Sequence, residues 1–306
     1  MKVFITGATG FVGRRLVRTL QDRGDEVVAW VRDPRRATEV LGEQVERVAT
    51  DVGEAALARH LAGADAVVNL AGENLFGGRW TRARKAALES SRIDLTGTLA
   101  RTLANLPGEE RPAVFVSASA VGYYGDRGAE RLTEASAPGD DFLAGLCQRW
   151  EAATTPAREA GLRTVILRIG VVLGEGGALG RLLPLFRLGA GGRLGNGQQA
   201  FPWIHVEDLV GILLAALDDP SLAGVYNATA PGSVTNAELT RALAKAVRRP
   251  ALVPVPGFAM KAALGEAAVA LLGGQDAVPQ RLLEAGFPFH YPDLDSALAA
   301  VVEGGR

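Results

Sequence analysis

The sequence of 306 residues is poor in cysteine, in net charge and in long apolar runs. Its single cysteine, Cys147, excludes an internal disulfide bond and any metal cluster built from cysteine ligands. The formal net charge of −1 creates no global field that would favour nucleic acid or an anionic membrane. No apolar run approaches the roughly 20 residues that span a bilayer, and no secretory signal is recognisable before the first strand-like segment. These absences predict a soluble, cytoplasmic protein with neither nucleic acid nor a membrane as its partner.

Lysine and tyrosine are also scarce, and their positions matter for the chemistry. Lysine occurs only at positions 2, 85, 245 and 261, so arginine supplies nearly all of the basic charge. Tyrosine occurs only at positions 123, 124, 226 and 291. The long interval between positions 124 and 226 therefore holds neither residue. Any mechanism that needs a Tyr and Lys pair from that interval is excluded.

The sequence does contain a regular alternation of short apolar runs with amphipathic stretches. The runs are rich in β-branched residues and apolar on both faces, which is typical of buried parallel strands. They predict strands at 2–6, 26–31, 66–71, 113–119 and 164–170, with a weaker strand at 45–50. Apolar residues at helical spacing predict helices at 11–23, 80–105 and 141–160. The alternation predicts an α/β fold with a doubly wound parallel sheet and right-handed crossovers.

The composition of the sequence changes after about residue 171. Glycine and proline become dense over 173–203, which predicts long loops around a site rather than regular layers. A helix at 206–218, a strand at 224–229, a helix at 235–248 and short proline-separated helices are expected to follow. We therefore predict a nucleotide-binding domain over 1–172, to which 200–230 returns, and a smaller C-terminal substrate lobe made of 173–199 and 231–306.

The segment TGATGFVG follows the first predicted strand and opens the first predicted helix. Its three glycines, Gly7, Gly10 and Gly13, stand three residues apart. This spacing provides a tight turn, a close approach of the backbone to a pyrophosphate, and a helix N-terminus that attracts an anion. The predicted cofactor-binding residues of this loop are Gly7, Thr9, Gly10, Phe11, Val12 and Gly13.

The end of the second predicted strand reads AWVRDP and bears on the choice of cofactor. An acidic side chain at this point would accept hydrogen bonds from a ribose 2′-hydroxyl and favour NAD. Arg32 follows the strand instead, and a guanidinium fork suits a 2′-phosphate. We predict NADP(H). The nearby Asp33, or an Arg32 that is merely solvated, leaves NAD as the alternative.

Two further strand ends are placed to meet a dinucleotide. Asp51 and Val52, in the tripeptide TDV, follow the third strand and can meet an adenine edge. The fourth strand closes with NLAG, in which Leu70 is followed by the small residues Ala71 and Gly72. Small residues are required there because the backbone must lie against the cofactor. No pattern of metal ligands accompanies them, so no metal is predicted.

In this order of motifs the chain resembles the extended branch of the short-chain dehydrogenase/reductase superfamily. The resemblance covers essentially the whole chain and is carried by TGATGFVG, DV, NLAG, SAS, LRIGVVLG and WIHVEDLV. Finer features, such as SASAVGYYG and the C-terminal VPVP segment, are similar to an epimerase-like subfamily with a C-terminal domain of unknown function. Members of that subfamily also carry a SulA-like cell-division label. The resemblance implies a Rossmann-type sheet, a nicotinamide cofactor and a substrate that is not established.

The resemblance also implies roles for individual residues at the ends of two strands. It identifies Ser119 as the catalytic serine at the end of the fifth strand, with Ser117 among the cofactor-binding residues. It places Arg168, Gly170 and Val172 where the chain passes the nicotinamide.

This sequence lacks the Tyr of such enzymes and the Lys that follows it four residues later. Glu151 fits the glutamate that follows the lysine, so the two positions hold Leu143 and Cys147. The missing lysine would lower the tyrosine pKa from near 10 and bind the nicotinamide ribose. A neutral thiol does neither well, and a cysteine on an apolar helix face is more often part of a core than a nucleophile.

Substitute proton donors are few. In GYYG, which follows Ser119 directly, Tyr123 is the best candidate and Tyr124 the next. The alternative is that one tyrosine packs in the core and the other bonds to the backbone. Glu73 and Arg92 are further polar residues that can face the site.

Three functions fit these observations. The first is an NADP(H)-dependent oxidoreductase of an unknown small carbonyl or alcohol, with Ser119 and Tyr123 as catalytic residues. The second is an epimerase or dehydratase of the sugar-nucleotide type, and the third is a non-catalytic NADP(H)-binding regulatory protein. A homodimer through the helices at 80–105 and 141–160 is compatible with the small residues Ala144 and Gly145.

Overall fold

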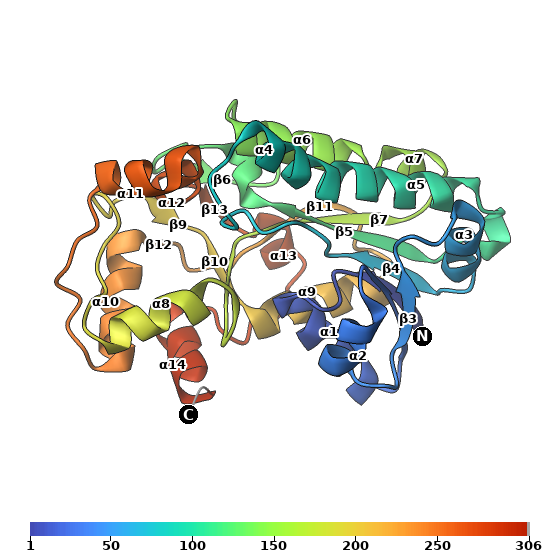
Figure 1. The fold of residues 1–306 in the computed structure, drawn as a ribbon, viewed down its shortest axis with the longest axis horizontal. Coiled ribbons are helices and arrows are strands. Elements are labelled where there is room, and N and C mark those ends of the chain that lie inside the picture. Colours follow the sequence, from blue (N-terminus) through green and yellow to red (C-terminus); the bar gives the residue numbers. More distant parts are fainter. Residues whose placement is uncertain (305–306) are drawn as a thin grey trace.

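A seven-stranded parallel sheet forms the centre of the molecule, whose computed structural model describes residues 1–304 (Figure 1). In spatial order its strands are β11 (Gly224–Ala228), β7 (Thr164–Ile169), β5 (Val114–Ala120), β4 (Ala66–Asn69), β1 (Lys2–Thr6), β2 (Glu26–Val31) and β3 (Glu46–Ala49). The strand order changes direction between β1 and β4, which is where open α/β sheets bind their ligands. The predicted α/β fold with a doubly wound parallel sheet is confirmed.

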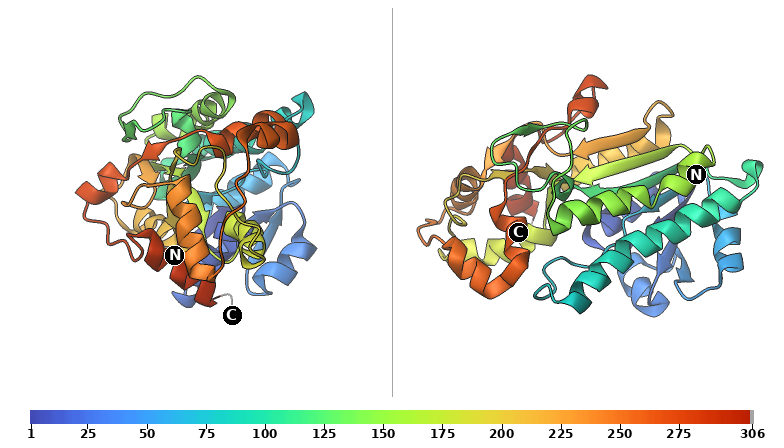
Figure 2. Two further views of the ribbon diagram at one scale, coloured as in Figure 1. Left: turned by 90° about the vertical axis from the view of Figure 1, so that its left-hand side faces the viewer. Right: turned by 90° about the horizontal axis from the view of Figure 1, so that it is seen from above.

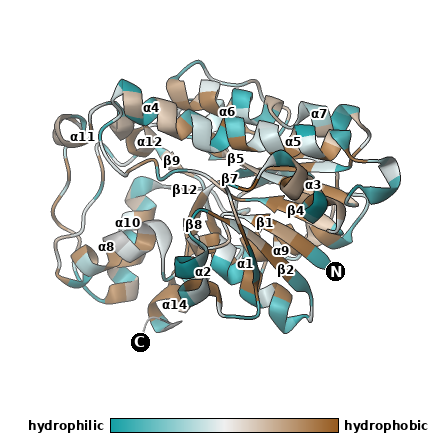
Figure 3. Cartoon of the chain, turned by 45° about the vertical axis from the view of Figure 1, so that its right-hand side comes forward, coloured by the Kyte–Doolittle hydropathy of each residue, from teal (hydrophilic) through white to brown (hydrophobic). Residues whose placement is uncertain are grey.

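Helices cover both faces of the sheet (Figure 1). One face carries α1 (Phe11–Asp22), α2 (Pro34–Leu41) and α9 (Val206–Asp218), and the other carries α3 (Glu54–Ala62), α4 (Arg82–Glu89), α5 (Leu95–Asn105), α6 (Phe142–Ala152) and α7 (Thr155–Glu159). Adjacent residues of β1 serve different cores, because side chains alternate along a strand. Ile5 packs on the α1 face with Leu16, and Phe4 packs on the α5 face with Leu99. The strands are accordingly among the most apolar segments in Figure 3.

The remaining elements form a smaller region beyond one end of the sheet (Figures 1 and 2). It contains β8 (Val171–Leu173) paired with β10 (Trp203–His205), β9 (Ala200–Phe201) paired with β12 (Val234–Thr235), and the helices α8 (Gly177–Arg187), α10 (Asn236–Val247), α11 (Gly257–Leu264), α12 (Val269–Leu272) and α14 (Leu294–Gly304). A core of its own surrounds Trp203, which is 1% exposed. The predicted domain boundaries stay a prediction.

The link between α9 and the C-terminal part of the chain is made by one buried carboxylate. Asp208, at the start of α9, accepts hydrogen bonds from the backbone N–H of His290 (2.7 Å) and of Tyr291 (3.0 Å). His205 lies against the Tyr291 ring, with 3.9 Å between the ring centroids. Three further short elements are β6 (Arg131–Leu132), β13 (Asp276–Ala277), which pairs with β6, and α13 (Gln280–Glu284).

The structure corrects the sequence prediction most clearly between 173 and 199. Long loops were expected there, but residues 177–187 form α8. Pro184 and two glycines hid this helix, because such residues are normally breakers inside a helix. Leu179, Leu183 and Phe186 nevertheless stand at helical spacing and pack into the core of the smaller region. The helices α2 and α3 were also not predicted.

The predicted helices at 80–105 and 141–160 are each subdivided. A π-helical segment, η1 (Ser90–Asp94), joins α4 to α5, and α6 ends at Ala152 before α7 begins at Thr155. A homodimer through these helices stays a prediction. No helix of the described residues is long and apolar enough to cross a membrane, and the cytoplasmic location stays a prediction.

Candidate functional site

The glycine-rich loop between β1 and α1 is packed so closely that two of its glycines have no room for a side chain. A Cβ at Gly7 would lie 2.6 Å from the carbonyl carbon of Leu70, and φ at Gly7 is +71°. A Cβ at Gly13 would clash with the carbonyl oxygen of Gly7 and lie 2.8 Å from the Cα of Ala8. Gly10 precedes α1 without a side-chain cap, and the loop-tip residues Thr9 and Gly10 are exposed. The loop therefore presents bare backbone next to the end of β4, as a dinucleotide pyrophosphate requires.

Phe11 connects this loop to the smaller region. A Cβ at Gly174 would lie 2.5 Å from the Phe11 ring, and one at Gly176 would lie 2.6 Å from it. The segment that leads from β8 into α8 therefore rests directly on the first residue of α1. Val12, the next residue, packs against the core beneath the sheet.

At the end of β2 the structure separates the roles of Asp33 and Arg32. The Asp33 carboxylate caps α2 and accepts hydrogen bonds from the backbone N–H of Arg35 (3.0 Å) and Arg36 (3.1 Å). The Arg32 side chain is 87% exposed and lies 3.7 Å from a carboxylate oxygen of Glu73. The acidic side chain is thus engaged by its own helix, and the cation is the group left to meet a ligand.

A buried polar network fixes the end of β4 beside the loop. Asn69 donates hydrogen bonds to Thr96 (2.7 Å) and to Ser117 (3.3 Å), and it accepts one from Thr6 (2.6 Å). The Thr6 hydroxyl in turn accepts from the N–H of Ala71 (3.2 Å). Ser117 is 1% exposed, so the structure places it within the sheet as a support for this strand end.

The other predicted cofactor-binding residues lie at nearby strand ends. Gly72 and Asp51 are exposed, whereas Val52 and Leu70 are half-buried. Gly170 has no room for a side chain, because a Cβ there would lie 2.9 Å from the carbonyl oxygen of Pro202. The half-buried Val172 follows it in β8. The roles predicted for these residues stay predictions.

Ser119 and Arg168 meet at one buried carboxylate that belongs to Glu151 of α6. The Ser119 hydroxyl donates to Oε1 of Glu151 (2.7 Å). Arg168 donates to both carboxylate oxygens, from Nε (2.8 Å) and from Nη2 (2.9 Å). The Arg168 and Glu151 side chains are 5% and 11% exposed. Burial opposes the charge of Arg168, but its bonds to Glu151 outweigh this effect and raise the Arg168 pKa.

The two tyrosines of GYYG differ in their surroundings. Tyr124 is fully buried, donates a hydrogen bond to Asn227 (2.7 Å) and accepts one from Arg168 (3.0 Å). Burial raises the pKa of Tyr124 despite the cation beside it. Tyr123 is half-buried, its ring lies 3.4 Å from the Arg168 guanidinium, and its hydroxyl makes no hydrogen bond within the described part of the chain. Tyr123 is thus the tyrosine whose hydroxyl is left for a ligand.

The positions of the missing Tyr and Lys are filled by apolar packing. Leu143 and Cys147 are 8% and 3% exposed. A Cβ at Gly122 would lie 3.4 Å from Leu143 and 3.8 Å from the Cys147 sulfur, so the turn that carries Tyr123 lies against both. Burial, reinforced by the charge of Glu151, raises the pKa of Cys147 to about 12. The cysteine is therefore a neutral core residue at ordinary pH.

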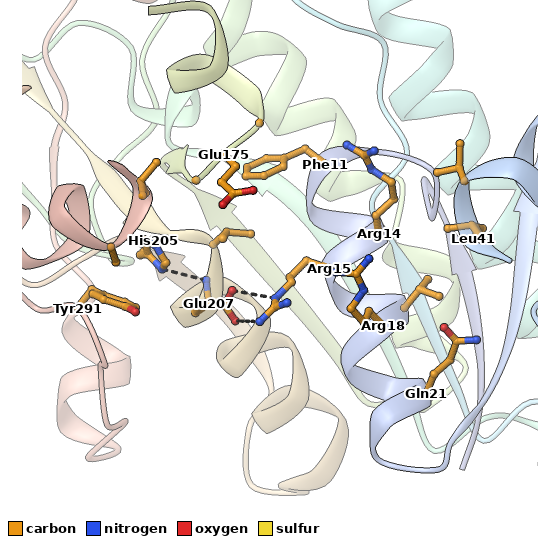
Figure 4. Close-up of a pocket in the computed structure, with 17 residues that line it drawn as sticks. Phe11, Arg14, Arg15, Arg18, Gln21, Leu41, Glu175, His205, Glu207 and Tyr291 are labelled. Carbon is orange, nitrogen blue, oxygen red and sulfur yellow. Dashed lines mark hydrogen bonds and ion pairs between the residues drawn. The ribbon is translucent and has the colours of Figure 1, made fainter. Parts of the chain in front are cut away.

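A cavity lies between α1, α2 and α14 (Figure 4). Its volume is about 690 Å³, and it shares only Phe11 with the predicted site. Arg15 on its wall forms an ion pair with Glu207 (2.8 Å), as Figure 4 shows. This cavity contains no predicted catalytic residue, and no group of His, Cys, Asp and Glu side chains within residues 1–304 could hold a metal ion.

Sequence reasoning missed the central part that Glu151 plays. In the sequence analysis Glu151 served only to locate the position of the missing lysine, yet its carboxylate binds both Ser119 and Arg168. The signal for this contact was the presence of one acid and one arginine at the edge of apolar segments, since a charge in a core requires a partner. Asn227, which accepts from Tyr124, was likewise not foreseen.

Comparisons with known proteins identify related families. Residues 3–229 match the model of the NAD dependent epimerase/dehydratase family, and residues 255–301 match a domain of unknown function, DUF1731. An epimerase family protein SDR39U1 homolog, chloroplastic, from Arabidopsis thaliana is 41% identical over 304 residues, which is 99% of this chain and 87% of that protein.

Two solved structures are also similar. The human epimerase family protein SDR39U1, solved with NADPH, has a TM-score of 0.88 at 37% identity, with 99% of each chain covered. A nucleoside-diphosphate sugar epimerase from Corynebacterium glutamicum has a TM-score of 0.79 at 36% identity, covering 99% of this chain and 58% of that one.

Proposed function

The chain belongs to the NAD dependent epimerase/dehydratase family, and from this premise we propose that it is an NADP(H)-dependent oxidoreductase of a small carbonyl or alcohol. The observation that carries the choice of cofactor is the capping of α2 by Asp33. Because that carboxylate is engaged, Arg32 remains to receive the 2′-phosphate. The similar human protein was solved with NADPH, which supports the same choice.

The residues at the strand ends fit such a cofactor. The loop from Gly7 to Gly13 offers backbone without side chains, and the start of α1 offers a helix N-terminus for the pyrophosphate. We propose that Asp51 and Val52 meet the adenine, and that the small residues Ala71 and Gly72 let the cofactor approach the backbone at the end of β4. When bound, NADP(H) supplies or accepts a hydride.

The proposed proton donor during reduction is the hydroxyl of Tyr123. Of the two tyrosines of GYYG, it is the one whose hydroxyl makes no hydrogen bond within residues 1–304, and it sits beside the positions that Tyr and Lys would otherwise hold. The Ser119 hydroxyl donates its hydrogen bond to Glu151, so its oxygen is available to accept a hydrogen bond from the hydroxyl of an alcohol substrate rather than to donate one. The cation over the Tyr123 ring, Arg168, holds that ring in place.

Cofactor binding can be tested without knowing the substrate. NADPH and NADH are added separately to the purified protein, and nicotinamide fluorescence and the thermal midpoint are recorded. We expect NADPH to bind at least about tenfold more tightly, because a charged hydrogen bond contributes about 1.5–3 kcal/mol. Arg32→Ala should remove most of this preference, whereas Arg59→Ala, which removes an exposed arginine from α3, should leave it. An equal or stronger effect of NADH contradicts the assignment.

The chemistry is tested with a panel of carbonyl compounds and NADPH consumption as the readout. Tyr123→Phe should abolish turnover while NADPH still binds, and Cys147→Ala should retain turnover. The reverse pattern contradicts the proposed site. Tight NADPH binding with no turnover across the panel would favour the non-catalytic, regulatory function instead.

A further inference from the structure

Arg92 lies in the π-helical segment η1, between α4 and α5. Such segments are rare and occur frequently at functional sites. The half-buried side chain of Arg92 reaches the ring of Trp150 in α6, with 5.3 Å between the guanidinium carbon and the ring centroid. It also covers Gly72 at the end of β4, because a Cβ at Gly72 would lie 3.1 Å from its Cζ and 3.1 Å from its Nη2. The guanidinium is thus held at the strand end proposed to meet the nicotinamide ribose.

The hydrogen bonds of Arg92 leave part of its guanidinium free. Nη2 donates to the carbonyl oxygen of Glu73 (2.9 Å), and Nη1 donates to the carbonyl oxygen of Leu88 (3.3 Å) and to the Ser91 hydroxyl (3.4 Å). An arginine has five N–H groups. Within the described residues the Nε–H and one Nη2–H have no acceptor, and both nitrogens face the exposed Gly72.

The charge of Arg92 is also uncompensated. No carboxylate of residues 1–304 lies within ion-pair distance of it. The nearest acid, Glu73, already pairs with Arg84 (3.2 Å) and lies 3.7 Å from Arg32. Three arginines therefore surround one acid at this strand end. Burial lowers the pKa of Arg92, which reflects the unfavourable free energy of a desolvated cation without a partner.

Arg92 and the turn that carries Tyr123 approach α6, the helix that holds the filled Tyr and Lys positions, from different elements. The turn that carries Tyr123 touches Leu143 and Cys147, and the charge of Arg92 acts on Cys147 against the burial that raises the pKa of this thiol. The guanidinium of Arg92 and the turn that carries Tyr123 thus both lie against α6, although neither belongs to α6.

We propose that Arg92 takes the cationic position left by the missing lysine, and that it binds a carboxylate carried by the substrate. A planar fork of neighbouring N–H donors matches the two oxygens of a carboxylate, and two donors remain free. The inference rests on the proposed function, since it assumes that the substrate carbonyl or alcohol lies beside Tyr123. It narrows the substrate class to small acids that carry a carbonyl or hydroxyl group.

The test compares acids with their neutral esters. The probes are 2-oxobutyrate, phenylglyoxylate and their methyl esters, added to protein saturated with NADP⁺, and binding is measured by calorimetry, so that turnover is not required. The wild-type protein should bind an acid at least about tenfold more tightly than its ester. Arg92→Gln should abolish this preference, and Arg92→Lys, which keeps the charge but not the fork, should retain part of it.

Arg149→Gln provides a matched control. It removes the same charge from a side chain of α6 that is 50% exposed and paired with Glu89, and it should leave the preference unchanged. If Arg92→Gln fails to fold, as judged by circular dichroism, Arg92→Lys still decides the question, because full preference in that variant overturns the proposed fork.

Each of the following outcomes would also overturn the inference. The first is that no acid binds the wild-type protein, or that acids and esters bind equally. The second is that the preference survives in Arg92→Gln. The third is that Arg92→Gln weakens NADPH about tenfold while the preference persists, since Arg92 would then serve the cofactor. Failure of the proposed function looks different, because acids would bind through Arg92 while no NADPH is consumed.

Discussion

The two ends of the site differ in what builds them. At the cofactor end the important atoms belong to the backbone. The required residues are glycines, because a Cβ at these positions would collide with nearby backbone atoms. At the acid–base end the important atoms belong to buried side chains, with Glu151 holding Ser119 and Arg168, and Arg168 holding Tyr124. The first end depends on close approach of backbone within the glycine loop and between that loop and the end of β4, and the second depends on contacts between α6, β5 and β7.

The difference explains why one end keeps a standard arrangement while the other departs from it. A backbone cradle needs only small residues at fixed spacing. A proton donor and its cation need only to reach the same point in space, so they can come from other elements, as Tyr123 and Arg92 do in the functions proposed above. Three predictions separate the two kinds of construction.

The largest effect is expected from breaking the buried ion pair. Glu151→Gln leaves Arg168 buried without its counter-charge, which should lower the free energy of unfolding by about 3–5 kcal/mol. Denaturant unfolding measures this change. Glu89→Gln breaks the exposed pair with Arg149 and should cost at most about 1 kcal/mol. Equal effects of the two variants would refute the distinction.

A smaller effect on stability, but a larger one on binding, is expected at the glycine loop. Gly13→Ala forces a Cβ against the backbone of Gly7 and Ala8, which should cost about 1–3 kcal/mol of stability. It should also weaken NADPH binding, as measured by nicotinamide fluorescence. Gly145→Ala, on α6, meets nothing within 4 Å and should stabilise the helix by up to about 1 kcal/mol. Unchanged NADPH binding in Gly13→Ala would show that the loop does not need bare backbone.

Near neutral pH the smallest effect is expected from Cys147, because its contribution to stability changes only in alkaline solution. The folded state raises its pKa from the ordinary value of 9.0 to about 12, because burial disfavours the thiolate. The unfolded state therefore loses the thiol proton first as the pH rises, so stability declines between about pH 9 and pH 12. The decline should reach about 1.4 kcal/mol per pH unit and be absent from Cys147→Ala. Parallel pH profiles of the two proteins would contradict this account.

Much of the fold could be predicted from the sequence, because buried parallel strands are apolar on both faces. The helix α9 was predicted with its observed bounds of 206 and 218, and the main strands were placed within a few residues. The helix α8 was not, since a proline and several glycines concealed an apolar pattern whose partner, the core around Trp203, is assembled from distant segments.

The site was predictable to a lesser degree. The glycine spacing and Arg32 follow from local geometry, but the capping of α2 by Asp33 had to be seen to decide which side chain is free. Which of two adjacent tyrosines bonds to Asn227 depends on a strand more than 100 residues away. The contact of Arg92 with Gly72 depends on an irregular turn that helical spacing does not reveal.

Phe11, at the end of the nucleotide loop, packs against Gly174 and Gly176, so the loop is in direct contact with the segment that leads into α8. A ligand that displaces Phe11 would therefore also change the packing of the segment that leads into α8. Thermodynamic linkage makes such an influence reciprocal. If bound cofactor raises the affinity for a substrate by some factor, then bound substrate raises the affinity for the cofactor by the same factor. Coupling between the nucleotide loop and the smaller region thus requires no long pathway, since the ring of Phe11 connects the two directly.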